Sequence, residues 1–310
     1  MKVRHRGSEQ SMISAQGRYL PTLAMLTAMA LWGSSFVAMK YSFFELNPLV
    51  VVLGRLLVAS LCFLPFLGAF VKVPLRRHHL LPMLGMALCE PCLYFLFEAA
   101  ALQQTSASQA SMITTMLPLL VALTAGLFLG EHVSGKTILG FFLAALGALW
   151  LTFAGTSTEQ APNPVLGNFL EFMAMVCATG YIILMKYLSR DLPPFFLTAV
   201  QCFVGALFFL PVLLLPQVEL PSTLPLSGLT IILYLGTFVS VGAYGLYNFG
   251  ISRIPASQAS SFINLIPVFS VVLGFLCLGE RLSFWQLLAS VLVFCGVILS
   301  QDRQPQAAAG

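Results

Sequence analysis

Charged side chains within apolar stretches are the residues of this sequence best suited to do chemistry. Glu90 lies about ten residues into the apolar run 80–102, and Arg55 lies about seven residues inside the run 48–71. Placing an ionisable group at the centre of a bilayer costs at least about 2.5–3.5 kcal/mol of free energy. Each of these residues therefore needs an interaction partner or a function that offsets this cost. Glu90 could bind a proton or face a substrate, or it could be a structural partner of Arg55 or of a Ser or Tyr hydroxyl. Arg55 could pair with Glu90 or Glu98, or contact an anionic substrate group directly.

Aromatic and amide side chains form a second group of candidates. Trp32, Ser35 and Met39 recur at spacings of three and four, so they share one face of a helix. A ring with a polar handle beside a hydroxyl suits a cavity that holds a ring or alkyl group, whereas packing is the alternative for Trp32. Asn264 could be a cavity wall or an interhelical hydrogen-bond partner. Glu90 is also the candidate for proton coupling. The full set predicted to bind substrate is Trp32, Ser35, Met39, Arg55, Glu90, Tyr94, Tyr181, Tyr244, Tyr247 and Asn264.

Three prolines mark predicted bends. Pro91 directly follows Glu90, whereas Pro118 and Pro267 lie near the middle of their apolar runs. A proline inside a helix removes a backbone donor and clashes with the carbonyl four residues earlier, so the carbonyls of Thr114 and Ile263 should lack their usual partners. We predict that the three prolines are hinges, with static kinks as the alternative.

Five further charged residues lie toward the ends of their apolar runs. Glu98, Lys40 and Glu171 are within a turn or two of the predicted outer surface, where we expect them to form a wet rim. Glu131 and Glu280 each follow a glycine at the end of a run. We expect those two carboxylates to bind nearby helix ends or basic groups.

The elements that position all these residues are apolar helices. With 58% hydrophobic residues, 8% charged residues and a mean hydropathy of +0.92, the chain of 310 residues has too little polar surface for a soluble globule. Ten apolar runs are close to the 20 residues needed to cross a bilayer, although the fifth and the tenth are short. They are 20–41, 48–71, 80–102, 107–128, 137–153, 167–188, 195–215, 227–250, 257–278 and 284–300.

The chain is also duplicated. Pairs offset by 149 residues join Ala107–Ser111 to Ala256–Ser260, Pro118 to Pro267, and Leu129–Glu131 to Leu278–Glu280. A fainter copy, offset by 146 residues, joins Met39–Tyr41 to Met185–Tyr187. Duplicated sets of membrane helices are typical of transporters, whose substrate site lies between the repeats.

Basic residues predict the orientation. If the amino terminus is cytoplasmic, twelve of the fifteen Lys and Arg residues lie inside, whereas only Lys40 and Arg281 lie outside. Each repeat has an odd number of spans, so the second repeat should be inverted relative to the first. Both termini should therefore face the cytoplasm, in a multi-pass protein of the cell inner membrane or plasma membrane.

These features together resemble the EamA family of the drug/metabolite transporter superfamily. The resemblance rests on Trp32–Phe36 (Trp-Gly-Ser-Ser-Phe), Lys40, Arg55 and the duplicated Ala-Ser-x-Ala, Pro and Gly-Glu, and it covers about 20–300. It implies an exporter or exchanger of small metabolites, amino acids and drugs, with a cavity formed mainly by helices 1–4 and 6–9. Ala178–Tyr181 stand where the first repeat has Trp32–Ser35, so the cavity should be lined asymmetrically.

We therefore predict an all-α membrane protein with ten transmembrane helices in two inverted five-helix repeats. The predicted segments are a cytoplasmic amino-terminal segment (1–19), repeats at 20–153 and 167–300, an outer linker (154–166) and a disordered tail (301–310). The predicted function is secondary transport of an amino acid or amphipathic metabolite by alternating access. The predicted partners are that small molecule and the lipid bilayer, with a possible homodimer and no nucleic acid.

Two other classes of function fit this sequence less well. An intramembrane enzyme acting on a lipid-linked substrate would need a nucleophile, a base or metal ligands clustered at one depth, and the short loops with few His and Asp supply no such cluster. A channel or a non-transporting scaffold is the other alternative, although polar side chains are too sparse for a channel. The Cys89–Cys92 spacing lacks a second ligand pair, so we expect packed thiols rather than a metal or redox site. We predict no enzyme activity, no cofactor and no metal.

Overall fold

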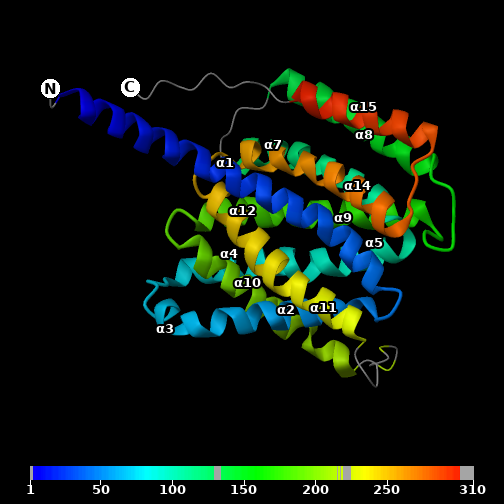
Figure 1. Cartoon of the computed structure of the whole chain (residues 1–310), viewed down its shortest axis with the longest axis horizontal. Coiled ribbons are helices and arrows are strands. Elements are labelled where there is room, and N and C mark those ends of the chain that lie inside the picture. The colour runs from blue at the N-terminus through cyan, green and yellow to red at the C-terminus, as the bar shows by residue number, and fades with distance from the viewer. Residues whose placement is uncertain (1–2, 129–133, 215, 217, 219–224, 301–310) are drawn as a thin grey trace.

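The computed structural model describes residues 3–128, 134–214, 216, 218 and 225–300. Its described residues form a bundle of helices joined by short connections (Figure 1). Eight helices within this part are long and apolar enough to cross a membrane, and Ile138–Phe153 and Phe284–Leu299 are shorter apolar helices. All ten begin and end within three residues of the predicted runs. The prediction of an all-α membrane protein with ten apolar helices is confirmed.

The first half of the chain supplies five spans. Its segments are α1 (Val3–Ser42), α2 (Pro48–Phe63), η1 (Leu64–Phe66), α3 (Leu67–Phe70), α4 (Arg77–Ala87), η2 (Leu88–Leu93), α5 (Tyr94–Gln104), α6 (Ala107–Ile113), η3 (Thr114–Met116), α7 (Leu117–Phe128) and α8 (Gly135–Phe153). The third span is α4–η2–α5 and the fourth is α6–η3–α7, so each changes its helical geometry part-way along. The helix α1 begins at Val3, so it extends back through the predicted amino-terminal segment.

The second half repeats this pattern. Its segments are α9 (Pro164–Leu188), α10 (Pro194–Phe209), η4 (Leu210–Leu214), α11 (Leu226–Tyr234), η5 (Leu235–Ala243), α12 (Tyr244–Ile251), α13 (Ala256–Ser261), η6 (Phe262–Leu265), α14 (Ile266–Leu278) and α15 (Phe284–Ser300). The π-helical segments η2 and η5 occupy equivalent places, and so do the 3₁₀ segments η3 and η6. The break at η5 was not predicted, because no proline marks it.

Local sequence explains where several helices begin. Asn47 and Asn163 each precede a proline, and their side chains accept hydrogen bonds from the backbone N–H groups of Leu49 and Leu166. Asparagine is a favourable N-cap, and proline fits the first helical position because its missing N–H would have no partner there. The same two-residue signal therefore starts α2 and α9.

The structure corrects the prediction of unpartnered carbonyls before the two mid-span prolines. The carbonyl of Thr114 accepts from the N–H of Leu117, and the carbonyl of Ile263 accepts from the N–H of Ile266. In an α-helix each of these carbonyls would bond to the residue four positions later, which is the proline and has no N–H. In both places a 3₁₀ turn precedes the proline, so the carbonyl bonds to the residue three positions later instead.

The two repeats interlock through close backbone approaches at small residues. Gly33 of α1 lies against α14, where an added Cβ would be 2.6 Å from the Cβ of Phe269. Gly236 of η5 lies against α2 in the same way, with Val58 2.5 Å from such a Cβ. Helices of one half therefore pack directly on helices of the other, and the main cluster of buried apolar residues contains both.

The fifth span of each repeat lies at the edge of this core, to which α8 contributes Leu151 and α15 contributes Ala289. Figure 1 shows α8 and α15 side by side along one edge of the bundle. Gly147 of α8 packs against Val293, and Gly296 of α15 packs against Ala144 and the Gly140 carbonyl. The face of α8 that carries Gly140, Ala144 and Gly147 therefore packs within the chain.

Candidate functional site

A cavity of about 40 Å³ lies between the repeats, at the level where several spans are interrupted. Its walls come from α1, α2, η2, α5, η3 and α7 of the first half and from α9, α12, η6 and α14 of the second. This volume holds a few water molecules. Eight of the ten residues predicted to bind substrate line it, namely Trp32, Ser35, Arg55, Glu90, Tyr94, Tyr181, Tyr244 and Tyr247.

Glu90 stands at a true break in its span. Its backbone is extended, with φ −150° and ψ 121°, inside η2, as the following Pro91 predicts. The Glu90 side chain is 5% exposed, and the hydroxyl of Tyr244 donates to its Oε1 across 2.5 Å. The carbonyl of Glu90 accepts from Gln201 Nε2 of α10 at 3.2 Å. Both the side chain and the main chain of Glu90 are therefore bonded to the second repeat.

Arg55 is almost fully buried, yet it forms no ion pair with Glu90 or Glu98 among the described residues. Its Nε donates to Ser240 Oγ at 3.0 Å, because the η5 break brings Ser240 opposite α2. The guanidinium carbon lies 4.4 Å from the centre of the Phe95 ring, a cation–π contact. The predicted Arg55–carboxylate pair is thus absent from this conformation.

Met39 and Asn264 are the two predicted residues that do not line the cavity. Met39 is buried behind Arg55, whose Nη1 lies 3.2 Å from the Met39 sulfur. Asn264 is buried, and neither of its amide atoms has a hydrogen-bond partner among the described residues, so neither the cavity-wall role nor the interhelical bond is seen. The 3₁₀ turn η6 instead places Ile263, and Ile266 just after it, at the cavity wall.

The aromatic residues form one cluster on the second-repeat side of α1. The ring of Trp32 is 5.1 Å from that of Tyr244 and 4.9 Å from that of Tyr247, centre to centre. Two polar atoms in this cluster, Trp32 Nε1 and the Tyr247 hydroxyl, are buried without a hydrogen-bond partner among the described residues. Buried polar groups are normally paired, so these two atoms are donors available to a molecule in the cavity.

A polar network behind the cavity was only partly predicted. The hydroxyl of Tyr181 donates to Asn248 Oδ1, whose Nδ2 donates to Thr198 Oγ1 at 2.8 Å and to Gln201 Oε1 at 3.2 Å. Through Gln201 this network reaches the carbonyl of Glu90. The signal for Thr198 and Gln201 was their spacing of three residues inside an apolar run, which places both on one helix face.

The predicted wet rim is wrong for three residues. Glu98, Lys40 and Glu171 are 3%, 4% and 0% exposed, respectively. Glu98 lines the cavity and accepts at 2.8 Å from the hydroxyl of Tyr94. Lys40 is covered by the 154–163 connection, whose Gln160 carbonyl accepts from its Nζ at 2.5 Å. Depth along a helix therefore did not predict burial, because neighbouring segments cover these side chains.

Lys40 and its copy Lys186 donate to equivalent backbone carbonyls in the two repeats. Lys40 Nζ donates to the carbonyls of Leu102 and Thr105, at the end of the third span. Lys186 Nζ donates to the carbonyls of Ile251 and Ile254, at the end of the eighth span. A cation beside the last carbonyls of a helix also complements the helix dipole.

These two lysines lie at opposite ends of the bundle. Lys40 bonds to Gln160, four residues before α9 begins at Pro164, whereas Lys186 lies in the last turn of α9. A helix of 25 residues is about 37 Å long. Equivalent contacts at opposite ends are the arrangement expected of repeats with opposite orientation.

Glu280 binds a helix start, as predicted. Its two carboxylate oxygens accept from the N–H groups of Ala107 and Ser108 at 2.8 and 2.9 Å, and from the Ser108 hydroxyl at 2.5 Å. A carboxylate there satisfies free N–H donors and complements the positive end of the helix dipole. Glu131, its copy, lies outside the described residues.

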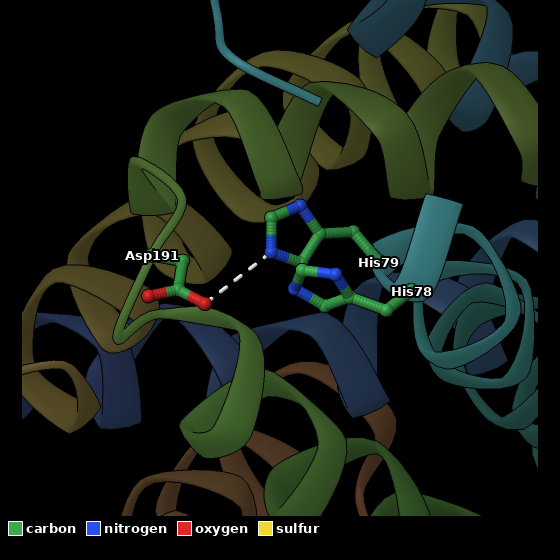
Figure 2. Close-up of side chains that lie close together, drawn as sticks. All are labelled: His78, His79 and Asp191. Carbon is green, nitrogen blue, oxygen red and sulfur yellow. Dashed lines mark hydrogen bonds and ion pairs between the residues drawn. The ribbon is translucent and has the colours of Figure 1, made fainter. Parts of the chain in front are cut away.

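Away from the cavity, Figure 2 shows His78, His79 and Asp191 close together, with potential ligand atoms all within 4.8 Å. His79 Nε2 lies 3.3 Å from Asp191 Oδ2, and His79 Nδ1 accepts from the N–H of Arg76 at 3.3 Å. A metal-bound histidine normally donates from its other ring nitrogen, whereas here that nitrogen accepts. The cluster therefore fits a link between α4 and the end of α9 better than a metal centre.

Comparison with known proteins places this geometry among transporters. The model of the EamA-like transporter family matches the chain twice, at residues 20–153 and 165–301. An uncharacterized transporter of Bacillus subtilis, YetK, is 25% identical over 92% of this chain and 88% of its own length. An uncharacterized transporter of Archaeoglobus fulgidus is 26% identical over 92% of this chain and 98% of its own.

Two more distant similarities extend this result. A chloroplastic WAT1-related protein of Arabidopsis thaliana is 24% identical over 92% of this chain and 70% of its own length. One crystal structure superposes with a TM-score of 0.66 over 90% of this chain and 96% of its own, at 19% identity. That likeness shows the fold alone.

Proposed function

Because this chain belongs to the EamA-like transporter family, we propose that it exports or exchanges a small amino acid or amphipathic metabolite. It is a multi-pass membrane protein, and its relatives carry the names of transporters. The proposed route is the cavity between the repeats, reached alternately from the two sides of the membrane.

The observation that carries this proposal is the set of buried polar groups left without partners at one cavity. Within the part of the chain that the structure describes, Trp32 Nε1, the Tyr247 hydroxyl and Glu98 Oε2 have no hydrogen-bond partner. Arg55 adds a cation with no ion-pair partner among the described residues, and its Nη2 forms no hydrogen bond with them. A substrate that satisfied these groups would repay the cost of burying them.

The chemistry of these groups favours a zwitterion or an amphipathic compound. Arg55 suits a carboxylate, because guanidinium groups bind carboxylates with two parallel hydrogen bonds. The free oxygen of Glu98 suits an amine, and the rings of Trp32, Tyr244 and Tyr247 suit an apolar or aromatic portion.

Alternating access would require the closed cavity to open on each side in turn. The proposed hinges are Pro91, Pro118 and Pro267, each next to a change of helix geometry. The break at η5 gives the second repeat a counterpart to the break at Glu90. Glu90, bonded at this break to Tyr244 of the other repeat, is the proposed proton-coupling residue. Full proton-coupled transport by Glu90→Gln in proteoliposomes would remove that role.

The proposed setting is the inner or plasma membrane, with both termini in the cytoplasm. Twelve of the fifteen basic residues fall on the cytoplasmic side in this orientation, in agreement with the positive-inside rule.

The decisive experiment compares metabolites released by cells that produce the intact protein with those released by cells producing Arg55→Ala. The matched control is Arg253→Ala, because Arg253 is exposed and stacks on Phe249 outside the cavity. We expect one compound class to accumulate outside with the intact protein and with Arg253→Ala, but not with Arg55→Ala. Tyr247→Phe, which removes a hydroxyl without a partner, should also lower release while leaving the protein level unchanged. Equal release by all four chains, each present in the membrane, would contradict the proposal.

A further inference from the structure

Two buried glutamates between the repeats have carboxylate oxygens that nothing in the described structure satisfies. Glu98 of α5 is 3% exposed, and Tyr94 donates to its Oε1 while its Oε2 has no partner. Glu171 of α9 is fully buried, and both of its oxygens lack partners. Three unpartnered carboxylate oxygens are a large cost for one small region, since an ionised carboxylate is strongly destabilised away from water.

Packing of the helices places the two glutamates at the same level. The helices α5 and α9 lie side by side in Figure 1 and run in opposite directions. Near the start of α9, an added Cβ on Gly167 would lie 2.6 Å from Thr105 Cβ, and near its middle one on Gly180 would lie 2.8 Å from Cys89 Sγ. Interpolation between these two contacts puts position 171 of α9 opposite about position 100 of α5, within one helical turn of Glu98. The two carboxyl groups also interact electrostatically.

A nearby cation, Arg55, attracts Glu98 electrostatically but donates no hydrogen bond to either glutamate. Arg55, the cation nearest to Glu98 in the cavity, donates to Ser240 and contacts Met39, and Lys40 donates to three backbone carbonyls. Neither cation forms an ion pair with either glutamate.

The other titratable groups facing the pair carry no positive charge. They are Tyr94 of α5, Glu90 of η2 and Tyr244 of α12. The helices α6 and α7, which also pack against α9, contain no titratable residue. Two adjacent carboxylates in such surroundings cannot both be ionised at a reasonable cost.

We propose that Glu98 and Glu171 form a proton-binding pair that holds a proton while the cavity is closed and releases it when water enters from one side. In the closed state one carboxyl carries the O–H and donates it to a free oxygen of the other. On opening, this O–H bond breaks, the proton passes to water, and the two carboxylates become hydrated. Glu98 lines the cavity, whereas Glu171 lies behind it, so Glu98 is the point of access. The release step rests on the proposed transport function, whereas binding of the proton does not.

The test is infrared spectroscopy of the purified full-length protein in lipid nanodiscs, which detects the C=O band of a protonated carboxylic acid. We expect this band at neutral pH in the intact protein and in E90Q. It should shift in E90Q/E98Q and in E90Q/E171Q, where one carboxyl of the pair remains buried, and disappear in E90Q/E98Q/E171Q. E171D, which keeps a carboxyl group, should retain the band. Transport is not needed for this readout, so its result is independent of whether the proposed function holds.

Other outcomes would overturn the proposal. A band that survives in E90Q/E98Q/E171Q would place the proton elsewhere, and a band lost in E90Q alone would assign it to Glu90. Thermal stabilisation of the intact protein by sodium chloride over choline chloride, absent in E171Q, would identify a sodium site instead. If the variants at Glu98 and Glu171 do not fold, E90Q alone decides. In E90Q, Glu98 and Glu171 are the buried acidic residues that remain among the described residues. No band in E90Q would contradict the pair.

Discussion

The hydroxyl of Tyr244 and the carboxyl of Glu90 meet across the two repeats at 2.5 Å, and Glu90 is the extended residue that interrupts the third span. This contact joins the wall of the cavity to the place where the helix bends. Any movement that separates the repeats here must break this buried hydrogen bond, or Glu90 and Tyr244 must move together as one unit.

Replacement of Tyr244 by Phe should therefore destabilise the protein. The change leaves Glu90 Oε1 buried without a donor, which costs about 1–3 kcal/mol. Thermal unfolding in detergent would measure the loss. Tyr187→Phe is the matched control, because Tyr187 is 42% exposed and no hydrogen bond of its hydroxyl is seen in the described structure. Equal melting temperatures for the two variants would contradict the importance of the contact.

Gly33→Ala should also destabilise the protein, despite the usual preference of helices for alanine. The added methyl would lie 2.6 Å from Phe269 Cβ and 2.8 Å from the Ile266 carbonyl, so α1 and α14 would have to move apart. Overpacking of this kind costs about 1–3 kcal/mol. Gly245→Ala, with nothing within 4 Å of the added carbon, should leave the melting temperature unchanged or slightly raised.

Lys40→Met and Lys186→Met should each weaken the fold at one end of the bundle. Each change removes a cationic donor from backbone carbonyls at a helix end, and hydrogen bonds to charged groups contribute about 1.5–3 kcal/mol. Limited proteolysis should then cut the connection 154–163 faster in Lys40→Met. Lys72→Met, at an exposed site, is the control and should resist proteolysis like the unchanged chain.

The proposed orientation predicts which loops a membrane-impermeant maleimide can reach in intact cells. In a chain whose native cysteines are replaced, a cysteine at position 159 should react from outside, whereas one at position 72 should react only after the cells are opened. Both positions are exposed in the structure, so burial does not bias the comparison. The reverse pattern would show that the termini face outward.

Much of the architecture could be predicted because the bilayer imposes a length on every apolar run. The ten helices, the break at Pro91 and the capping role of Glu280 all follow from local signals. The break at η5 could not be found in this way. Small residues such as Gly236 and Ser240 permit the break, but the segment contains no proline that would predict it.

The partners of the charged residues were harder to predict, because they depend on helix rotation and on what covers each end. Arg55 is bonded to Ser240, 185 residues away along the chain, and not to a carboxylate of its neighbouring span. Lys40 and Glu171 are buried although their depth along the helix placed them near the surface. Sequence gives the depth of a residue in its helix, whereas the neighbouring helices determine its environment.

The hydrogen bonds of Glu280 to the start of α6 have a consequence for synthesis of the chain. The ribosome makes Ala107 and Ser108 long before Glu280, so the first turn of α6 leaves the ribosome without its final acceptor. Until the ninth span is inserted, the first N–H groups of the fourth span must therefore donate to water or to lipid headgroups. Assembly of this protein is therefore completed late, and a chain truncated before Glu280 should contain inserted helices that have not yet closed into one bundle.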